Sequence, residues 1–253
     1  MIEALTEDPA TTALLFDLDG TLAAITEDPD ETIVSEDVVA RLGELAEAFG
    51  LVAIVTGRAL DRSFEMLGTD DLAVAAVHGM HMHWPDGRSW LDPAAEAARP
   101  QLDIAVQMAR TVGWRYEDKQ AAVALHFRHL KDPEHTARQM KSQIATVIDP
   151  RTIVVYDAKQ AVELRPRGGA TKGDAIEHLL REAEGEITRV LYAGDDMTDV
   201  DAFERLADMD AEAHAVAVDS DETPDAVTDA ATEVVDGVEA LHELVEELAA
   251  AVR

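Results

Sequence analysis

Residues 13–21 read ALLFDLDGT, and this stretch decides the fold of the chain around it. Its four apolar residues, 13–16, predict a short buried strand. Asp17 and Asp19 follow the strand directly, and residues two apart in extended chain point the same way. Both carboxylates can therefore face one point beyond the carboxyl edge of a sheet, where doubly wound folds bind ligands. Gly20 permits a tight exit from the strand.

The paired carboxylates of Asp17 and Asp19 predict a bound cation. Two negative charges this close repel each other unless a positive charge lies between them. A hard cation with oxygen ligands, most simply Mg²⁺, removes that repulsion. The motif alone is also compatible with a calcium-binding loop or a plain turn, so the rest of the chain has to distinguish these alternatives.

Three further junctions between predicted strands and helices carry side chains suited to phosphate chemistry. Each could be only a cap or a turn when it is taken alone. Together they supply the nucleophile, general acid, cation site and positive clamp that phosphoryl transfer needs. The residues are Thr56 and Gly57 after the apolar run 51–55, Lys172 at the start of a predicted helix, and Asp195, Asp196 and Asp199 after the apolar run 189–194.

Strands that alternate with helices along most of the chain indicate an α/β fold with a doubly wound parallel sheet. Between residues 99 and 166 the pattern changes to two helices and about four strands, which predicts an inserted α+β unit. The expected organisation is a core of residues 1–98 and 167–253 with this unit as a second domain. Residues 167–173, RGGATKG, have the wrong glycine–lysine spacing for a nucleotide-binding P-loop.

The four junctions, in this order, resemble the motifs of the haloacid dehalogenase superfamily of phosphotransferases. The resemblance implies that Asp17 is the nucleophile and Asp19 the general acid/base. It implies that Thr56 and Lys172 hold the phosphate, with Gly20, Thr21 and Gly57 beside them. The implied Mg²⁺ ligands are Asp17, the backbone carbonyl of Asp19 and Asp195, with Asp196 and Asp199 supporting.

Longer stretches resemble the trehalose-6-phosphate phosphatases within that superfamily. These stretches are FDLDGTLAAITEDPDETIVS, VTGR, VHGM, YEDKQAAVALHFR, VELRPRGGATKG and GDDMTDVDAF, spread over about residues 13–203. The resemblance implies that the inserted unit is a cap that covers the active site and selects the sugar. Its implied sugar contacts are Glu117, Lys119, Arg128 and Glu163, with Arg58 and His78 on the core side.

Two departures from the family pattern stand out. The family commonly has Glu after the late Thr-Asp pair, where this chain has Val200 followed by Asp201. The link before the lysine, RPRGGATKG, is longer and less hydrophobic than usual. Neither departure changes a residue of the proposed chemistry.

Charge is the most unusual property of the composition. The chain holds 21 basic and 52 acidic residues, for a net charge of −31, and the acids are spread over every segment. Such a surface repels nucleic acid and anionic membranes. It favours a halophilic protein built for molar salt, where the Debye length is only about 3 Å; an ordinary acidic enzyme is the alternative.

Other features of the sequence narrow the setting of the protein. With no cysteine, the chain can form no disulfide and no thiolate metal site. No apolar run is long enough to span a bilayer, and the acidic start lacks a signal-peptide pattern, so a cytoplasmic protein is expected. The family resemblance implies a phosphosugar substrate and a functional coupling to a trehalose-6-phosphate synthase.

The sequence is compatible with three functions. Hydrolysis of trehalose 6-phosphate leads. A related phosphatase acting on mannosyl-3-phosphoglycerate, sucrose 6-phosphate or glucosylglycerol phosphate is the nearest alternative. A non-catalytic phosphosugar sensor is a third, although Asp17 and Asp19 are both intact. The histidines at 78, 81 and 83 could bind a transition metal, but lining the substrate site or a structural role suits them better.

Overall fold

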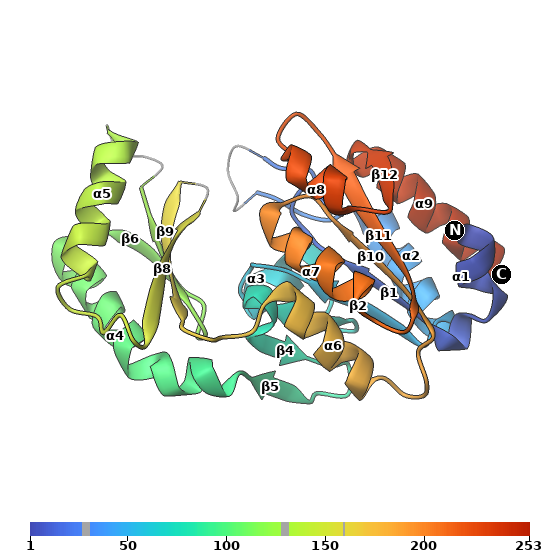
Figure 1. The fold of residues 1–253 in the computed structure, drawn as a ribbon, viewed down its shortest axis with the longest axis horizontal. Coiled ribbons are helices and arrows are strands. Elements are labelled where there is room, and N and C mark those ends of the chain that lie inside the picture. The colour runs from blue at the N-terminus through green and yellow to red at the C-terminus, as the bar shows by residue number, and fades with distance from the viewer. Residues whose placement is uncertain (27–30, 128–131, 159) are drawn as a thin grey trace. The chain divides into compact units, whose positions relative to one another are not determined.

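The computed structural model describes residues 1–26, 31–127, 132–158 and 160–253. The chain forms two compact units, unit 1 of Met1–Ser89 with Ala170–Arg253 and unit 2 of Trp90–Gly169 (Figure 1). The sequence placed the insertion at 99–166, so the two divisions differ mainly at the first boundary. There, the first helix of the insertion begins at Pro93, ahead of the predicted boundary, and Asp92 caps it.

An eight-stranded sheet forms the centre of unit 1, and its last strand in the spatial order, Ser89–Leu91, continues across the boundary with unit 2. Its strands are β1 (Thr12–Phe16), β2 (Leu51–Val55), β3 (Ala73–Ala76), β4 (His81–His83), β5 (Ser89–Leu91), β10 (Arg189–Gly194), β11 (Glu212–Asp219) and β12 (Glu233–Asp236). They lie in the order β12-β11-β10-β1-β2-β3-β4-β5. From β12 to β3 every pair is parallel, and β4 runs antiparallel to β3. The strand that leads to Asp17, β1, is therefore central.

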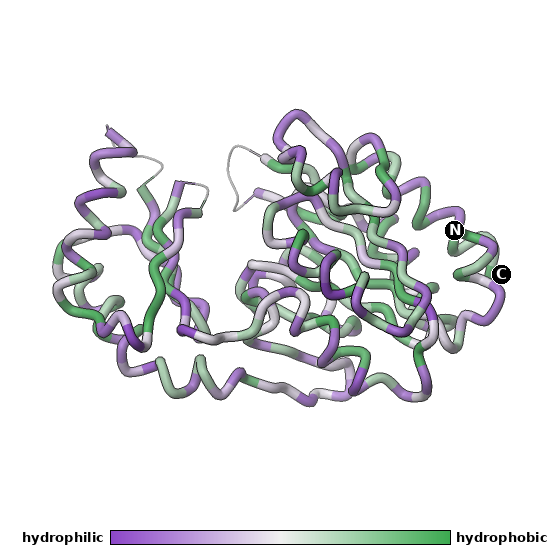
Figure 2. Tube along the Cα trace, viewed as in Figure 1, coloured by the Kyte–Doolittle hydropathy of each residue, from purple (hydrophilic) through white to green (hydrophobic). Residues whose placement is uncertain are grey.

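Helices cover both faces of this sheet, as the alternating pattern predicts. They are α1 (Ile2–Glu7), α2 (Glu36–Ala48), α3 (Leu60–Leu67), α6 (Lys172–Glu182), α7 (Met197–Ala207), α8 (Asp225–Ala230) and α9 (Gly237–Ala251), with short 3₁₀ turns at Pro9–Thr11 and Val77–Gly79. In Figure 1, α6 and α7 pass in front of the sheet and α2 lies behind it. Hydrophobic residues concentrate in the central strands (Figure 2), and every residue of β1 is buried. The predicted α/β class is confirmed.

Unit 2 is a four-stranded antiparallel sheet with two helices on one face. Its elements are α4 (Pro93–Val112), β6 (Arg115–Asp118), β7 (Val123–His126), α5 (Pro133–Ile144), β8 (Ile153–Ala158) and β9 (Ala161–Pro166), and its strand order is β6-β7-β9-β8. Alternate strand residues such as Val123 and Leu125 pack with both helices into a separate apolar core. Ala124 and Glu163, which pair across the sheet, belong to its other face.

Local signals explain where the helices begin. Ser35 caps α2 by accepting a hydrogen bond from Val38 N. Thr171 caps α6 in a reciprocal capping box with Asp174, which fixes the first turn at Lys172. None of the helices in the described ranges is both long and apolar enough to cross a bilayer.

The acidic surface leads to a testable salt dependence. Among the described residues, the buried acidic side chains are Asp17, Asp92, Glu163, Asp195 and Asp199, so most of the 52 acids of the chain face solvent. Their repulsion is unscreened in dilute buffer. We expect the Tm to rise by at least about 5 °C between 0.1 and 2 M KCl, which corresponds to roughly 1 to 3 kcal/mol.

A non-ionic osmolyte at equal osmolality serves as the control, because it screens no charge. A Tm that stays flat or falls in KCl, or that rises equally in the osmolyte, would contradict halophilic adaptation. The catalytic assignment does not depend on this result.

Candidate active site

Asp17 and Asp195 come together because their strands are neighbours in the parallel sheet. The strands β1 and β10 pair in register from Thr12–Arg189 to Phe16–Ala193, and Asp17 N continues the ladder by donating to Ala193 O at 2.9 Å. Each aspartate follows its strand at the carboxyl edge, and each is only 5% exposed. The sheet thus brings two residues far apart in sequence to one point.

Gly20 lets the loop after β1 close against Asp195. It has a φ of +79°, and a Cβ at this position would lie 2.0 Å from Asp195 Oδ2. Thr21, the next residue, donates from Oγ1 to Asp195 Oδ1 at 3.2 Å. No side chain larger than hydrogen therefore fits at position 20 without displacing the Asp195 carboxylate.

Lys172 is the cation nearest to these acids in the described structure. It is the first residue of α6 and is 2% exposed. Its Nζ lies 2.9 Å from Asp17 Oδ2 and 2.6 Å from Asp199 Oδ1. Burial lowers the pKa of Lys172, but the charges of Asp17 and Asp199 outweigh burial, so that the pKa lies above its ordinary value. Lys172 is therefore a permanent positive charge at the site.

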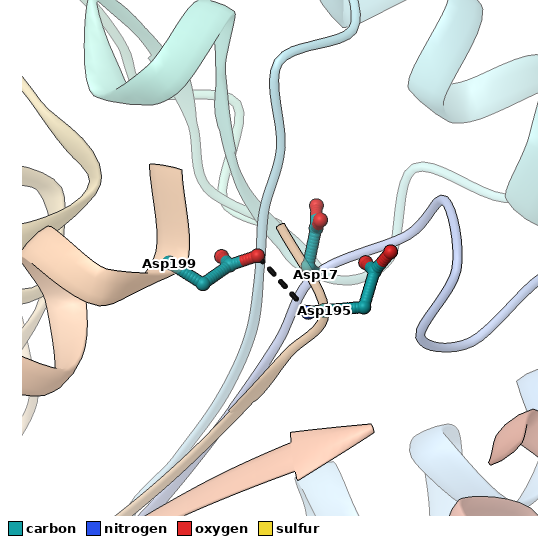
Figure 3. Close-up of side chains that lie close together, drawn as sticks. All are labelled: Asp17, Asp195 and Asp199. Atoms are coloured by element: carbon teal, nitrogen blue, oxygen red, sulfur yellow. Dashed lines mark hydrogen bonds between the residues drawn. The ribbon is translucent and has the colours of Figure 1, made fainter. Parts of the chain in front are cut away.

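Asp199 organises the loop between β10 and α7 (Figure 3). Its Oδ2 accepts from Asp195 N at 3.1 Å and from Asp196 N at 2.9 Å, while its Oδ1 accepts from Lys172 and from the Tyr192 hydroxyl. Four donors fill the roughly four acceptor positions of a carboxylate. The side chain of Asp196 also accepts protein hydrogen bonds, because it caps α7 by accepting from the amides of Met197 and Asp199.

The chemistry of the donor set fits a metal ion. One oxygen from each of Asp17, Asp195 and Asp199 lies within 4.8 Å of the others, and all three residues are buried. Burial raises the pKa of Asp17 well above its ordinary value; Lys172 opposes this in part, and the neighbouring aspartates add to it. Burial, with the charge of Asp199, raises the pKa of Asp195 to about 7. One lysine does not balance these acids, and a bound cation would.

Asp19 and Thr56 lie at the same edge of the sheet. Asp19 is gripped by Arg58, whose Nε and Nη2 donate to its two oxygens at 2.7 and 2.5 Å. Such a two-pronged ion pair fixes the plane of the carboxylate. Thr56 follows β2, is 1% exposed, and accepts from Arg58 N at 3.2 Å. Arg58 is thus placed by the predicted phosphate-binding turn and orients the predicted general acid/base.

His78 packs directly on that turn. A Cβ at Gly57 would lie 2.6 Å from His78 Cε1, so the imidazole requires glycine there. His78 adopts a left-handed conformation, with φ 58°, and its amide donates to Thr56 O. Within the described ranges His81 and His83 belong to no group of three candidate metal ligands, so their alternation supports no transition-metal site.

The predicted sugar contacts of unit 2 divide into three cases. Glu163, in β9, is 3% exposed, and its oxygens bind Lys119 Nζ at 2.9 Å and Arg165 Nε at 2.6 Å. Glu117 is about one-third exposed and lies 3.8 Å from His126 Nε2. The remaining residue of the predicted set, Arg128, lies outside the described residues.

Sequence reasoning missed Tyr192 and Arg165. Arg165 binds Glu163 and also lies 5.0 Å from the ring centroid of Tyr156. Tyr192 contributes one polar side-chain atom, its hydroxyl oxygen, to the buried part of the strand RVLYAG. Burial raises the pKa of this hydroxyl well above its ordinary value. A tyrosine three residues before an acidic cluster is a usable signal, but a strand pattern treats it as one more apolar residue.

Known proteins resemble this chain in sequence and in fold. A family model described as trehalose-phosphatase matches residues 15–236. A probable trehalose-phosphate phosphatase of Sinorhizobium fredii is 34% identical over 206 residues, covering 80% of this chain and 76% of that protein. A trehalose-6-phosphate phosphatase of Escherichia coli is 33% identical over 211 residues, covering 80% and 77%. A solved structure described as a trehalose-6-phosphate phosphatase related protein has a similar fold, with a TM-score of 0.76 at 24% identity, over 94% of this chain and 97% of that one.

Proposed function

The chain belongs to the trehalose-phosphatase family, and we propose that it hydrolyses trehalose 6-phosphate to trehalose and inorganic phosphate. The observation that carries the proposal is the buried group of Asp17, Lys172 and Asp195 at the carboxyl edge of the sheet. A nucleophile beside a fixed positive charge and a cation site is what phosphoryl transfer requires.

The proposed chemistry has two steps. An oxygen of Asp17 attacks phosphorus and forms an aspartyl-phosphate, while Asp19 gives a proton to the departing sugar oxygen. Asp19 then takes a proton from water, which attacks the same phosphorus and frees Asp17 together with inorganic phosphate. Lys172, the Thr56 hydroxyl and the Gly57 amide hold the phosphate oxygens, and Arg58 orients Asp19.

We propose Mg²⁺ as the metal, with Asp17, Asp195 and the backbone carbonyl of Asp19 as its protein ligands. Asp199 and Asp196 would support it indirectly, because their oxygens already accept protein hydrogen bonds. When bound, the metal would supply positive charge that polarises the phosphate and offsets the crowded carboxylates.

The direct test is phosphate release, with Mg²⁺, from a panel of phosphosugars at equal concentration. Trehalose 6-phosphate should give the highest kcat/KM. Preference for sucrose 6-phosphate, mannosyl-3-phosphoglycerate or glucosylglycerol phosphate would replace the substrate and keep the chemistry. Phosphosugar binding without turnover would instead support the sensor alternative.

Sugar recognition is assigned to the helix-free face of the unit 2 sheet. Glu163 pairs across the sheet with Ala124 and Tyr156, so these side chains share that face. Lys119, Glu163 and Arg165 form a connected polar row there. A cluster that is already ordered by ion pairs can bond hydroxyl groups at little entropic cost. Cytoplasmic location and coupling to a synthase remain proposals from the sequence.

Glu163→Gln should separate sugar recognition from phosphate chemistry. The change keeps the volume but removes the charge that orders Lys119 and Arg165. We expect kcat/KM for trehalose 6-phosphate to fall by about 100-fold, equivalent to roughly 2.7 kcal/mol. Hydrolysis of p-nitrophenyl phosphate should change less than about threefold, because this substrate has no sugar hydroxyls to bind.

Asp157→Asn is the matched control for charge. Asp157 is in the same sheet, is well exposed, and pairs with Lys141 of the helix α5. This variant should retain both activities. If Glu163→Gln lowers the kcat/KM of both substrates equally, Glu163 has a structural role. If it lowers the kcat/KM of neither, sugar recognition lies elsewhere.

A further inference from the structure

Tyr192 places a hydroxyl group in the fully buried interior of unit 1. It is the fourth residue of β10, is 0% exposed, and pairs in register with Leu15 of β1 and Ala215 of β11. Its ring packs edge-on against Phe203 of α7, with the centroids 5.8 Å apart. Packing alone would be met by phenylalanine, so the hydroxyl needs a separate explanation.

The hydroxyl donates to Asp199 Oδ1. A hydroxyl buried without a partner would cost about 1–3 kcal/mol, and pairing with a carboxylate removes that cost. The same oxygen accepts from Lys172 Nζ at 2.6 Å. Asp199 Oδ1 is therefore held between two donors, one from the sheet and one from α6.

This sharing affects the lysine that faces the nucleophile. The ammonium of Lys172 lies between Asp199 and Asp17, at 2.6 and 2.9 Å. A second donor on Asp199 takes up part of its negative charge and fixes the position of the oxygen. Less of the lysine charge is then committed to Asp199, and more is directed to Asp17 and to a phosphate bound beside it.

We propose that Tyr192 is a positioning residue for phosphoryl transfer. By donating to Asp199 it fixes that carboxylate and leaves more of the Lys172 charge available to Asp17 and to a bound phosphate. The inference rests on the proposed reaction class but not on the identity of the sugar. A purely structural tyrosine would affect only the stability of the fold.

Tyr192→Phe tests this inference, with Phe203→Leu as the matched control. The first variant removes only the hydroxyl, and the second disturbs the packing of the same ring while leaving the hydroxyl bond. Each is measured at least 15 °C below its own Tm, with Mg²⁺. The measurements are kcat and KM for p-nitrophenyl phosphate and for trehalose 6-phosphate, and the Kd of inorganic phosphate by calorimetry.

For Tyr192→Phe we expect kcat to fall about tenfold for both substrates and the Kd of inorganic phosphate to rise about fivefold. Phe203→Leu should lower the Tm and leave kcat and Kd within about twofold. The inference is overturned if Tyr192→Phe keeps kcat and Kd within twofold, or if Phe203→Leu changes them as much. If wild type ignores trehalose 6-phosphate, only the substrate proposal fails, because p-nitrophenyl phosphate and inorganic phosphate still report on the site.

Discussion

Asp17→Asn should lower kcat by at least about 10⁴-fold, equivalent to roughly 5 kcal/mol of transition-state stabilisation. Asparagine has nearly the same shape, but its amide cannot form the acyl phosphate. The loss should be in kcat and should be the same for trehalose 6-phosphate and p-nitrophenyl phosphate, because both pass through the same intermediate. Steady-state kinetics with Mg²⁺ measures it.

The fold should survive this substitution. The Asp17 carboxyl is buried and repelled by Asp195 and Asp199, so neutralising it relieves repulsion, while Lys172 keeps Asp199 as a partner. The Tm of the metal-free variant should therefore lie at most a few degrees below that of the metal-free wild type. Asp208→Asn, an exposed change of equal charge at the end of α7, should keep full activity. Activity of Asp17→Asn within tenfold of wild type would exclude the aspartyl-phosphate mechanism.

Removal of the metal should abolish turnover, by at least about 10³-fold, and Mg²⁺ should restore it. The physical reason is the excess of buried negative charge around Asp17 and Asp195, which only a cation can offset while both are ionised. Dialysis against EDTA, followed by titration with Mg²⁺, measures the loss and the recovery. Full activity in EDTA would exclude the proposed metal site.

The same site gives the metal effect a pH dependence. The pKa of Asp195 is raised from 3.8 to about 7 in the folded chain. The folded state therefore binds the proton of the Asp195 carboxyl more tightly than the unfolded chain does. Its contribution to stability is therefore lost as the pH rises from about 4 through 7. We expect Mg²⁺ to raise the Tm more at pH 8 than at pH 5.5, where protons compete for the ligands.

Asp195→Asn should remove most of this pH-dependent gain, whereas Asp208→Asn should keep it. An equal gain at both pH values in the wild type would show that the carboxyl of Asp195 does not bind the metal.

The sequence predicted the parts of the site that depend on strand ends. Asp17, Thr56 and Asp195 each follow an apolar run, and the parallel order of these strands makes their ends meet. Lys172 was predicted from a helix start and lies beside Asp17 as expected for that edge. The roles of these residues in catalysis remain predictions for the experiments above.

Other features depend on packing that no local pattern contains. The strands β4 and β5 are three residues each and were not predicted, because so short a run has no clear period. The amphipathic spacing predicted a helix over residues 100–113, whereas α4 begins at Pro93 and continues through Pro100. The hydrogen bonds of Asp199 and the grip of Arg58 on Asp19 link residues whose contact only the folded chain reveals.

The discontinuity of unit 1 also delays the assembly of its sheet during synthesis, because its two segments are far apart in the chain. Thr12 of β1 pairs with Arg189, which is 177 positions later, so at ordinary rates of synthesis this partner emerges roughly 9 to 35 s after β1. All strands of unit 2 lie within residues 90–169 and leave the ribosome earlier. The nascent chain therefore carries Asp17, the proposed nucleophile, after a strand that still lacks its β10 partner, and it has no Asp195 until residue 195 has emerged. A chain that stalls before residue 172 presents Asp17 and Asp19 but lacks Lys172 and Asp195, so the proposed site is incomplete.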